Sequence, residues 1–201
     1  MNPCLKIAQF IPPALSTIDI TPTIQVPIRN RDQSISYALI SKAKQVDMPL
    51  DWQCDWNRLF LDLEEDYYEG IVKIKYQNVL LGLVKYTFYP NPPDHIEFLE
   101  INHLEALPKP SRKAHPIGRW LIWYVCNLAL NYCSLESSAK ILFLNSVGNA
   151  FTFYRDTIRM EYIEPVTLAP GEDGYAFRFN RRDAQNFCEN LEKTYGCPAV
   201  L

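Results

Sequence analysis

Basic side chains gather in and just before the segment KAHPIGRWLI, residues 113–122, and they are Lys109, Arg112, Lys113, His115 and Arg119. No Asp or Glu occurs between Ala106 and Leu135, and the residues that follow are apolar enough for a helix. A helix N-terminus prefers anions by roughly 0.3–1 kcal/mol per charge, so cations placed there are unfavourable on their own. A bound phosphate would remove this conflict, because first-turn N–H groups and nearby cations both favour it. The segment therefore predicts a phosphate site, with a solvated basic loop as the alternative.

Pro116 lies at the predicted start of this helix. Proline at the first helical position gives up an N–H group that has no partner within the helix. It also removes one possible phosphate donor. The N–H groups of Ile117, Gly118 and Arg119 remain available for an anion.

The helix that would position these groups is predicted over residues 117–132. One face is apolar, and it carries Ile117, Leu121, Val125, Leu128 and Tyr132. Trp120, Ile122 and Leu130 extend the apolar surface around most of the circumference. A helix of this kind is buried on several sides, as a central helix packed on a sheet would be.

Strands and helices are expected on both sides of this helix. Strands are predicted over 69–76, 79–89 and 95–107 before it, and over 139–144 and 174–180 after it. A helix is predicted over 32–46, with Asp32 or Ser34 as its N-cap, and another over 145–158, with Asn145 or Ser146 as its N-cap. A third helix is predicted over 181–196, with Asp183 near its start and Gly196 at its C-terminal end. The expected fold class is α+β, in α/β three-layer form, with a mixed, mostly antiparallel central sheet flanked by helices. Residues 1–30 are expected to be a proline-rich, extended arm packed on a single domain formed by residues 31–201.

Composition excludes several classes of protein. The chain has 201 residues, 48% hydrophobic and 21% charged, with a net charge of −3, so nothing drives it as a whole towards nucleic acid. The N-terminus is a poor signal peptide, and no apolar run is long enough for a membrane span. None of the six cysteines forms a C-x-x-C pair, so no metal is expected, and Cys126 and Cys133 are expected to be buried free thiols. We expect a cytoplasmic protein in a reducing compartment that binds neither nucleic acid nor membrane.

Two blocks of sequence resemble the GNAT superfamily of acetyl-CoA-dependent N-acetyltransferases. The first, LEALPKPSRKAHPIGRWLIWYV, is similar to the strand and the Q/R-x-x-G-x-G/A pyrophosphate loop that enter the central helix of that family. Lys113 is in the Q/R position, Pro116 in the first glycine position and Gly118 in the second. The second, ILFLNSVGNAFTFYRDTIRMEYIEP, is similar to the family's next strand, its helix ending in Phe-Tyr and its final hairpin strand. The resemblance spans about Glu69 to Glu164.

The sequence departs from the family pattern at three further points. Val147 stands where the family commonly has Asn, three residues before the matching Ala150. The glycine that usually follows the tyrosine is replaced around Ile158 and Arg159, with one apparent insertion.

The resemblance implies roles for particular residues. Tyr154 would be the general acid that protonates the leaving thiolate. The cofactor would be acetyl-CoA, and its pantetheine would lie along the backbone of Leu104, Glu105 and Ala106. Its pyrophosphate would bind at Arg112, Lys113, Ala114, His115, Pro116, Ile117, Gly118 and Arg119. Asn149 would also contact the cofactor. His103 and His115 are expected to be structural rather than catalytic.

The general base needs a carboxylate on the third strand that faces the acceptor. Simple alternation puts Phe98, Glu100, Asn102 and Leu104 on one face of this strand and Leu99, Ile101 and His103 on the other. The second set is expected to face the buried helix. Glu100, acting through water, is therefore the candidate base, followed by Glu105 and Glu97.

The acceptor is the least readable part of the sequence. The strip DWQCDWNRLFLDLEEDYY, residues 51–68, could bind a cationic amine or a peptide N-terminus, or it could be an exposed acidic helix face with core tryptophans. The expected function is transfer of an acetyl group to a primary amine by direct attack on the thioester. The alternatives are an inactive GNAT-like binding or regulatory protein and a toxin-like acetyltransferase. A homodimer is also considered.

Overall fold

The computed structural model describes residues 22–63, 68–90, 96–108, 110–134 and 140–201 of the chain. Its strands are β1 (Ile24–Asn30), β2 (Ile35–Lys42), β3 (Glu69–Tyr76), β4 (Val79–Tyr89), β5 (Phe98–Ala106), β6 (Ala114–His115), β7 (Leu142–Val147), β8 (Glu161–Ala169), β9 (Glu172–Phe179) and β10 (Ala199–Val200). Its helices are α1 (Trp56–Leu61), α2 (Ile117–Tyr132) and α3 (Arg181–Tyr195), with short helical segments η2 (Gln45–Asp47), η3 (Gly148–Ala150) and the π-helix η4 (Phe153–Ile158).

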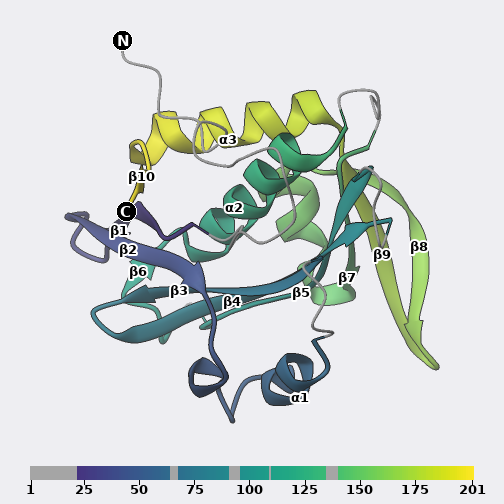
Figure 1. Ribbon diagram of the computed structural model, residues 1–201, viewed down its shortest axis with the longest axis horizontal. Coiled ribbons are helices and arrows are strands. Elements are labelled where there is room, and N and C mark those ends of the chain that lie inside the picture. The colour runs from purple at the N-terminus through teal and green to yellow at the C-terminus, as the bar shows by residue number, and fades with distance from the viewer. Residues whose placement is uncertain (1–21, 64–67, 91–95, 109, 135–139) are drawn as a thin grey trace.

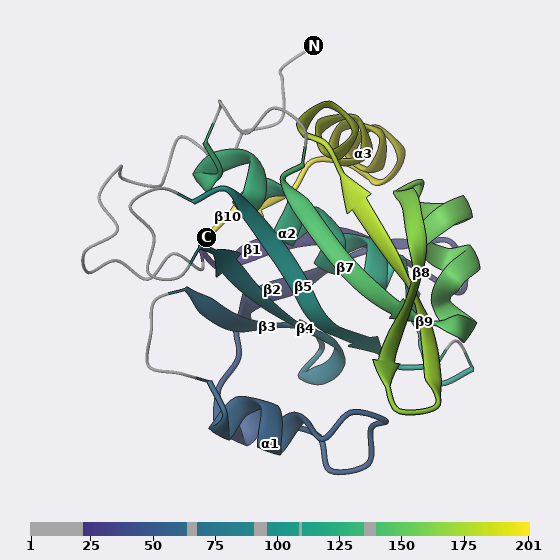
Figure 2. The ribbon, with the colours of Figure 1, turned by 90° about the vertical axis from the view of Figure 1, so that its right-hand side faces the viewer.

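Within the described ranges, the strands form one sheet in the order β10-β1-β2-β3-β4-β5-β7-β9-β8, with β6 paired to β1. Neighbouring strands are antiparallel except β5 and β7, which are parallel. Helices α2 and α3 cover one face of the sheet, and α1 lies against the other (Figures 1 and 2). The expected mixed, mostly antiparallel sheet flanked by helices is confirmed.

Helix α2 forms the middle layer of the main core. The indole N–H of Trp120 donates to the carbonyl oxygen of Pro27 at 2.7 Å and so joins α2 to β1. The indole N–H of Trp123 donates to Glu192 Oε1 at 2.8 Å and joins α2 to α3. Both tryptophans are almost fully buried, so each hydrogen bond satisfies a donor that water cannot reach. The prediction of a buried helix over 117–132 is confirmed with the same bounds.

A smaller core lies on the opposite face of the sheet. Trp56, the first residue of α1, has no exposed surface and packs on Ile71 and Leu83 of the sheet. The prediction that residues 51–68 contribute a core tryptophan is therefore confirmed for Trp56. Residues 64–67, the most acidic part of the strip, lie outside the described residues.

The predicted helix over 32–46 is wrong. Ile35–Lys42 form strand β2, and Gln33 at the preceding turn has φ of 68°. Asp32 accepts a hydrogen bond from the N–H of Ser34 at 3.0 Å, which closes this turn instead of capping a helix. Exposed and buried residues alternate along β2, and pairing with β1 and β3 decides between this period of two and the helical period.

The predicted helix over 145–158 is wrong in its first part. Strand β7 continues to Val147, and Ser146 is buried opposite Tyr175 of β9, so neither Asn145 nor Ser146 caps a helix. Helical backbone begins only at Gly148 and becomes a π-helix from Phe153. The hydrogen bonds of the sheet take up the residues that a helix would have needed.

The expected arm and thiols have mixed outcomes. Ile24–Asn30 are extended, as expected, and lie inside the sheet between β2 and β10, whereas residues 1–21 lie outside the described residues. Cys126 and Cys133 are buried free thiols. Cys197 is disulfide-bonded. No helix of the described ranges is long and apolar enough to cross a membrane.

Candidate active site

The parallel strands β5 and β7 are paired over three residues and then separate. Leu99, Glu100 and Ile101 pair with residues 142–144. Beyond this point β7 continues in register with β9, and β5 continues in register with β4 as far as Ala106. The second half of β5 therefore has no strand on its β7 side among the described residues. Its free backbone edge includes Leu104–Ala106, the residues to which the resemblance assigns the pantetheine, and this edge is available to an extended ligand.

A β-bulge in β5 lies at the point of separation. The register with β4 shifts between Lys85, which pairs with His103, and Tyr86, which pairs with Ile101, so Asn102 is the extra residue. A bulge places an additional residue on one strand and changes which side chains face each side of the sheet.

The bulge corrects the predicted face assignment. Leu104 pairs with buried Val84 and contacts the main core, together with Leu99 and Ile101. His103 lies on the opposite face, where its ring contacts Trp56 with the centroids 6.3 Å apart. Simple alternation was wrong for Leu104 and His103, because it assumed an unbroken strand. Glu100, which precedes the bulge, is opposite Thr87 on the α1 face, as expected.

The basic segment before α2 forms one wall of a cavity of about 450 Å³. The lining includes eight of the predicted cofactor residues: Arg112, Lys113, Ala114, His115, Pro116, Ile117, Gly118 and Arg119. Phe153 and Thr157 of η4 form the facing wall. We call this cavity the cradle. The structure therefore brings the predicted phosphate-binding segment and the segment carrying the predicted acid into one site.

Pro116 is the residue before the first helical turn, not the first helical residue as predicted. Its carbonyl oxygen accepts from the N–H of Trp120 at 3.3 Å, and no side chain caps the helix. The first turn contains no acidic residue. The N–H groups of Ile117, Gly118 and Arg119 therefore start the helix, and they lie on the wall of the cradle.

Gly118 lies where α2 approaches β5 and η4. A Cβ atom at this position would lie 3.4 Å from Phe153 Cζ and 3.9 Å from Leu104 Cδ2. The start of α2, the free edge of β5 and the π-helix therefore meet at one point. A ligand bound in the cradle could continue directly along β5.

Arg31 is a cradle residue that the sequence analysis missed. Its guanidinium donates to the carbonyl oxygens of Pro110, at 2.6 Å, and Arg112, at 3.3 Å, and so holds the basic loop against the β1–β2 turn. Arg112 is half-buried, its Nε has no hydrogen-bond partner among the described residues, and burial lowers its pKa. A half-buried cation with an unused donor favours a bound anion. Arg31 lies about 80 positions from the loop, so only chain folding could reveal it.

Tyr154 is buried beside the point where β5 and β7 separate. Its ring lies 5.7 Å from Phe177, measured between centroids, and Phe177 pairs with Leu144, the last β7 residue that also pairs with β5. The side chain is 6% exposed, and burial raises the pKa of the hydroxyl above its usual value. Tyr154 therefore stays protonated in its resting state and has a proton that it can donate.

Glu100 is half-buried on the α1 face of β5. Burial raises the pKa of its carboxyl group, and hydrogen bonding with Tyr89 partly opposes this effect. Nearby on the same face, the Thr87 hydroxyl lies 3.0 Å from Glu69 Oε1 and 2.8 Å from Asn102 Oδ1. A half-buried carboxyl group with a raised pKa beside the strand opening is a candidate general base.

Glu105, a lower-ranked base candidate, has a structural arrangement of hydrogen bonds. Its carboxylate accepts from the N–H groups of Gln53, at 2.8 Å, and Cys54, at 3.1 Å, and from the indole N–H of Trp56, at 3.0 Å. These three donors hold the segment before α1 against β5. The backbone of Glu105, rather than its side chain, remains available to a ligand at the free edge.

The other predicted residues have less direct relations to the cradle. Asn149 is exposed in η3 and does not line it. His103 Nδ1 is buried without a hydrogen bond among the described residues, and burial and the charge of Lys85 lower the pKa of the ring. His115 does line the cradle. The described part of the chain contains no group of three His, Cys, Asp or Glu side chains placed to hold a metal ion.

Comparisons with known proteins agree on the fold. No protein-family model and no curated protein matches the sequence. Among solved structures, the chain is similar to Arabidopsis thaliana Naa50 in complex with the bisubstrate analogue CoA-Ac-MVNAL, with 14% identity, 71% of this chain and 98% of that chain covered, and a TM-score of 0.52. It is also similar to the aminoglycoside acetyltransferase AAC(6')-Ib in complex with coenzyme A and kanamycin, with 11% identity, 74% and 98% coverage, and a TM-score of 0.52. The mixed, mostly antiparallel sheet flanked by helices matches these structures, and the chain has the fold of the GNAT acetyltransferases.

Proposed function

We propose that the protein is an acetyl-CoA-dependent N-acetyltransferase that transfers an acetyl group to a primary amine. The observation that carries the proposal is the meeting of the cradle with the free edge of β5 at Gly118. This arrangement gives an anionic and extended cofactor one continuous path. Two solved structures of the same fold are described as complexes with coenzyme A or a CoA-based analogue, which supports the same assignment.

The residues of the cradle fit the phosphate end of this cofactor. The N–H groups of Ile117, Gly118 and Arg119 would bind the pyrophosphate, and the side chains of Arg112 and Lys113 would add charge. The pantetheine would then extend along the free backbone edge of β5 at Leu104–Ala106. This path ends near the β-bulge. There Tyr154 lies on the α2 side of the sheet and Glu100 on the α1 side.

The chemistry follows from these two side chains. The neutral amine attacks the thioester carbonyl, a C–N bond forms, and the C–S bond breaks. Glu100, acting through water, accepts the proton that the amine loses, and Tyr154 donates a proton to the leaving thiolate. The products are an N-acetylated acceptor and free CoA. The acceptor would approach from the α1 face, where Glu100 lies.

Calorimetry with acetyl-CoA tests the cofactor assignment directly. We expect saturable binding to the wild-type protein, and weaker binding to Lys113→Glu, because this change adds a negative charge beside the pyrophosphate. Lys140→Glu is the matched control, since Lys140 precedes the end of β7 that lies away from the strand opening. Absence of acetyl-CoA binding at high micromolar concentration would contradict the proposal.

A second function remains open because Pro116 contributes no N–H group to the cradle. A GNAT-fold protein that binds CoA without catalysis would act as a binding or regulatory partner. Release of free CoA thiol with a panel of amines and peptides separates the two functions. Turnover supports the enzyme, whereas CoA binding with no turnover on any acceptor supports the regulatory protein.

A further inference from the structure

Two carboxylates flank one threonine on the face of the sheet that carries Glu100. Thr87 of β4 is paired with Glu69 of β3 on one side and with Glu100 of β5 on the other. Paired residues point to the same face, and neighbouring strands lie about 4.8 Å apart, so Thr87 lies between the two carboxylates. Asn102, the extra residue of the bulge, also reaches the Thr87 hydroxyl. We call Glu69, Thr87, Glu100 and Asn102 the carboxylate cluster.

The carboxylate cluster has more hydrogen-bond acceptors than donors. The Thr87 hydroxyl has one proton, yet it lies 3.0 Å from Glu69 Oε1 and 2.8 Å from Asn102 Oδ1. Glu69 Oε2 is buried, and no hydrogen bond reaches it among the described residues, although Lys85 Nζ lies 3.1 Å away as an ion pair. A buried acceptor without a donor is unfavourable, so a ligand rich in N–H groups would stabilise this cluster.

A row of aromatic rings borders the carboxylate cluster on the same face. Tyr89 and Phe98 are stacked with their centroids 5.0 Å apart, and Phe98 meets the edge of Phe143 at 5.0 Å. Phe143 is paired with Glu100, and all three rings are half-buried. We call these three residues the aromatic row. Its partly exposed rings suit a flat apolar body, which would lie beside the carboxylates.

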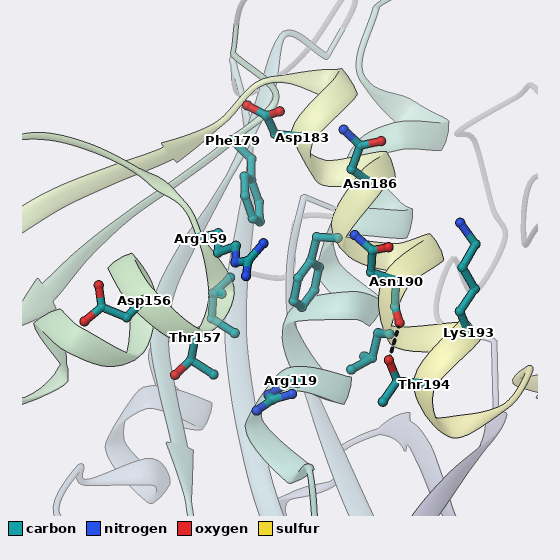
Figure 3. A pocket seen from close by; sticks show the side chains of 13 residues that line it. Arg119, Asp156, Thr157, Arg159, Phe179, Asp183, Asn186, Asn190, Lys193 and Thr194 are labelled. Atoms are coloured by element: carbon teal, nitrogen blue, oxygen red, sulfur yellow. Dashed lines mark hydrogen bonds between the residues drawn. The ribbon is translucent and has the colours of Figure 1, made fainter.

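The two faces of the sheet differ in charge near the strand opening. On the α2 face, Arg119, Arg159 and Lys193 line a cavity of about 850 Å³ beside the cradle (Figure 3). On the α1 face, Glu69 and Glu100 are the charged groups on either side of Thr87. An anionic cofactor and a cationic acceptor would therefore each meet charge of the opposite sign.

The cations around the carboxylate cluster already have partners among the described residues. Lys85 pairs with Glu69. The Arg178 guanidinium donates to both carboxylate oxygens of Glu161 at 2.6 Å. Lys140 Nζ lies over a ring of the aromatic row, 6.0 Å from its centroid. This part of the face therefore offers little to a carboxylate or phosphate on the acceptor.

We infer that the acceptor is an arylalkylamine, a primary amine on an aromatic body without an acidic group, an inference that rests on the proposed function. The ammonium group lies over Thr87, and its three N–H donors supply the protons that the carboxylate cluster lacks. The aromatic body lies on the aromatic row. Glu69 is then a specificity residue that holds the amine, while Glu100 takes its proton. An α-amino acid binds poorly, because its carboxylate faces two others.

Release of CoA thiol from acetyl-CoA by five acceptors tests the inference. The acceptors are 2-phenylethylamine, propylamine, phenylalanine, spermidine and a short peptide with a free N-terminus. Propylamine lacks only the ring, and phenylalanine adds only a carboxylate. We expect kcat/KM of the wild type to be at least about tenfold higher for 2-phenylethylamine than for each of the others, because burial of a ring and repulsion of a charge are each worth this much.

Two variants separate the aromatic row from the carboxylate cluster. Phe98→Leu should lower the preference for 2-phenylethylamine over propylamine roughly fivefold, and this ratio does not depend on the fraction of folded protein. Glu69→Gln should raise KM for 2-phenylethylamine about tenfold and leave kcat and acetyl-CoA affinity unchanged. Glu189→Gln is the matched control, since Glu189 is exposed on α3 on the other face of the sheet.

The outcomes distinguish the inference from the proposed function. Faster turnover of any of the other four acceptors than of 2-phenylethylamine would overturn the inference and leave the proposed function intact. An unchanged KM in Glu69→Gln would remove Glu69 from acceptor binding and would also count against the inference. CoA release with none of the acceptors would overturn the proposed function, and the inference with it.

Discussion

The carboxylate of Glu105 accepts a hydrogen bond from the indole N–H of Trp56 at 3.0 Å and so ties α1 to the free half of β5. Two further bonds from the N–H groups of Gln53 and Cys54 end on the same carboxylate. We expect Glu105→Ala to lower the free energy of unfolding by about 1–3 kcal/mol, because it leaves a buried indole donor unsatisfied. Urea denaturation measures this loss. Exposed Glu172→Ala is the control, and an equal small effect of both changes would contradict the role of Glu105.

Gly82 and Gly118 both face the contact between α2 and the sheet, but they differ in space. A Cβ at Gly82 would lie 2.9 Å from Leu121, 3.1 Å from Ile117 and 3.2 Å from a backbone carbonyl. We expect Gly82→Ala to destabilise the fold by about 1–3 kcal/mol through overpacking. Gly118→Ala, with its nearest contact at 3.4 Å, should leave stability equal or higher, since alanine favours a helix. Thermal unfolding of the two variants side by side checks the contrast.

Tyr154→Phe tests the proposed acid. The variant keeps the ring that packs on Phe177 and removes only the hydroxyl. We expect kcat to fall roughly 100-fold, as removal of a general acid does, while acetyl-CoA affinity stays nearly unchanged. Tyr132→Phe, which removes a buried hydroxyl at the far end of α2, should leave kcat unchanged. An unchanged kcat for Tyr154→Phe would remove this residue from the mechanism.

The raised pKa of Glu100 predicts the acid side of the rate profile. A base must be deprotonated, so kcat/KM should rise with pH through the pKa of this group. Burial raises that pKa above its ordinary value of 4.5, and the acid limb should therefore lie above pH 4.5. Glu100→Gln should abolish the limb and lower the rate roughly 100-fold. Exposed Glu164→Gln should keep the wild-type profile. An acid limb that persists in Glu100→Gln would assign the base to another group.

Asp47 predicts a pH dependence of stability that is separate from catalysis. Burial alone would raise its pKa, but bonds from Lys73, Lys75 and the Lys44 N–H outweigh burial and lower the pKa to about 2. A lowered pKa stabilises the fold above the ordinary value of 3.8, and the benefit is lost as pH falls towards about 2.

Asp47→Asn should therefore be less stable than the wild type at neutral pH. The difference should shrink below pH 3.8 and vanish near pH 2. Chemical denaturation at several pH values measures it, with exposed Asp51→Asn as a control. A difference that is constant with pH would show that the Lys73 and Lys75 ion pairs do not contribute.

Local sequence patterns were sufficient where the apolar surface of a single segment determines its secondary structure. The apolar circumference of 117–132 predicted α2 with its observed bounds, since only a helix could bury those residues on several sides. The same reasoning failed at Ile35–Lys42, because the strand becomes stable only when β1 and β3 pair with it. A short alternating segment does not carry information about its partners.

The candidate site divides in the same way. The cations of Arg112–Arg119 and the absence of acidic residues around them are properties of the sequence, and they predicted the cradle before any fold was known. The tertiary structure alone added Arg31, reversed the predicted faces of Leu104 and His103, and engaged the Glu105 carboxylate with Trp56. A bulge, a strand separation and a contact between distant segments all depend on which strands pair. Pairing is a cooperative property of the whole sheet, and so the sequence determined which chemistry was available while the fold decided where it came together.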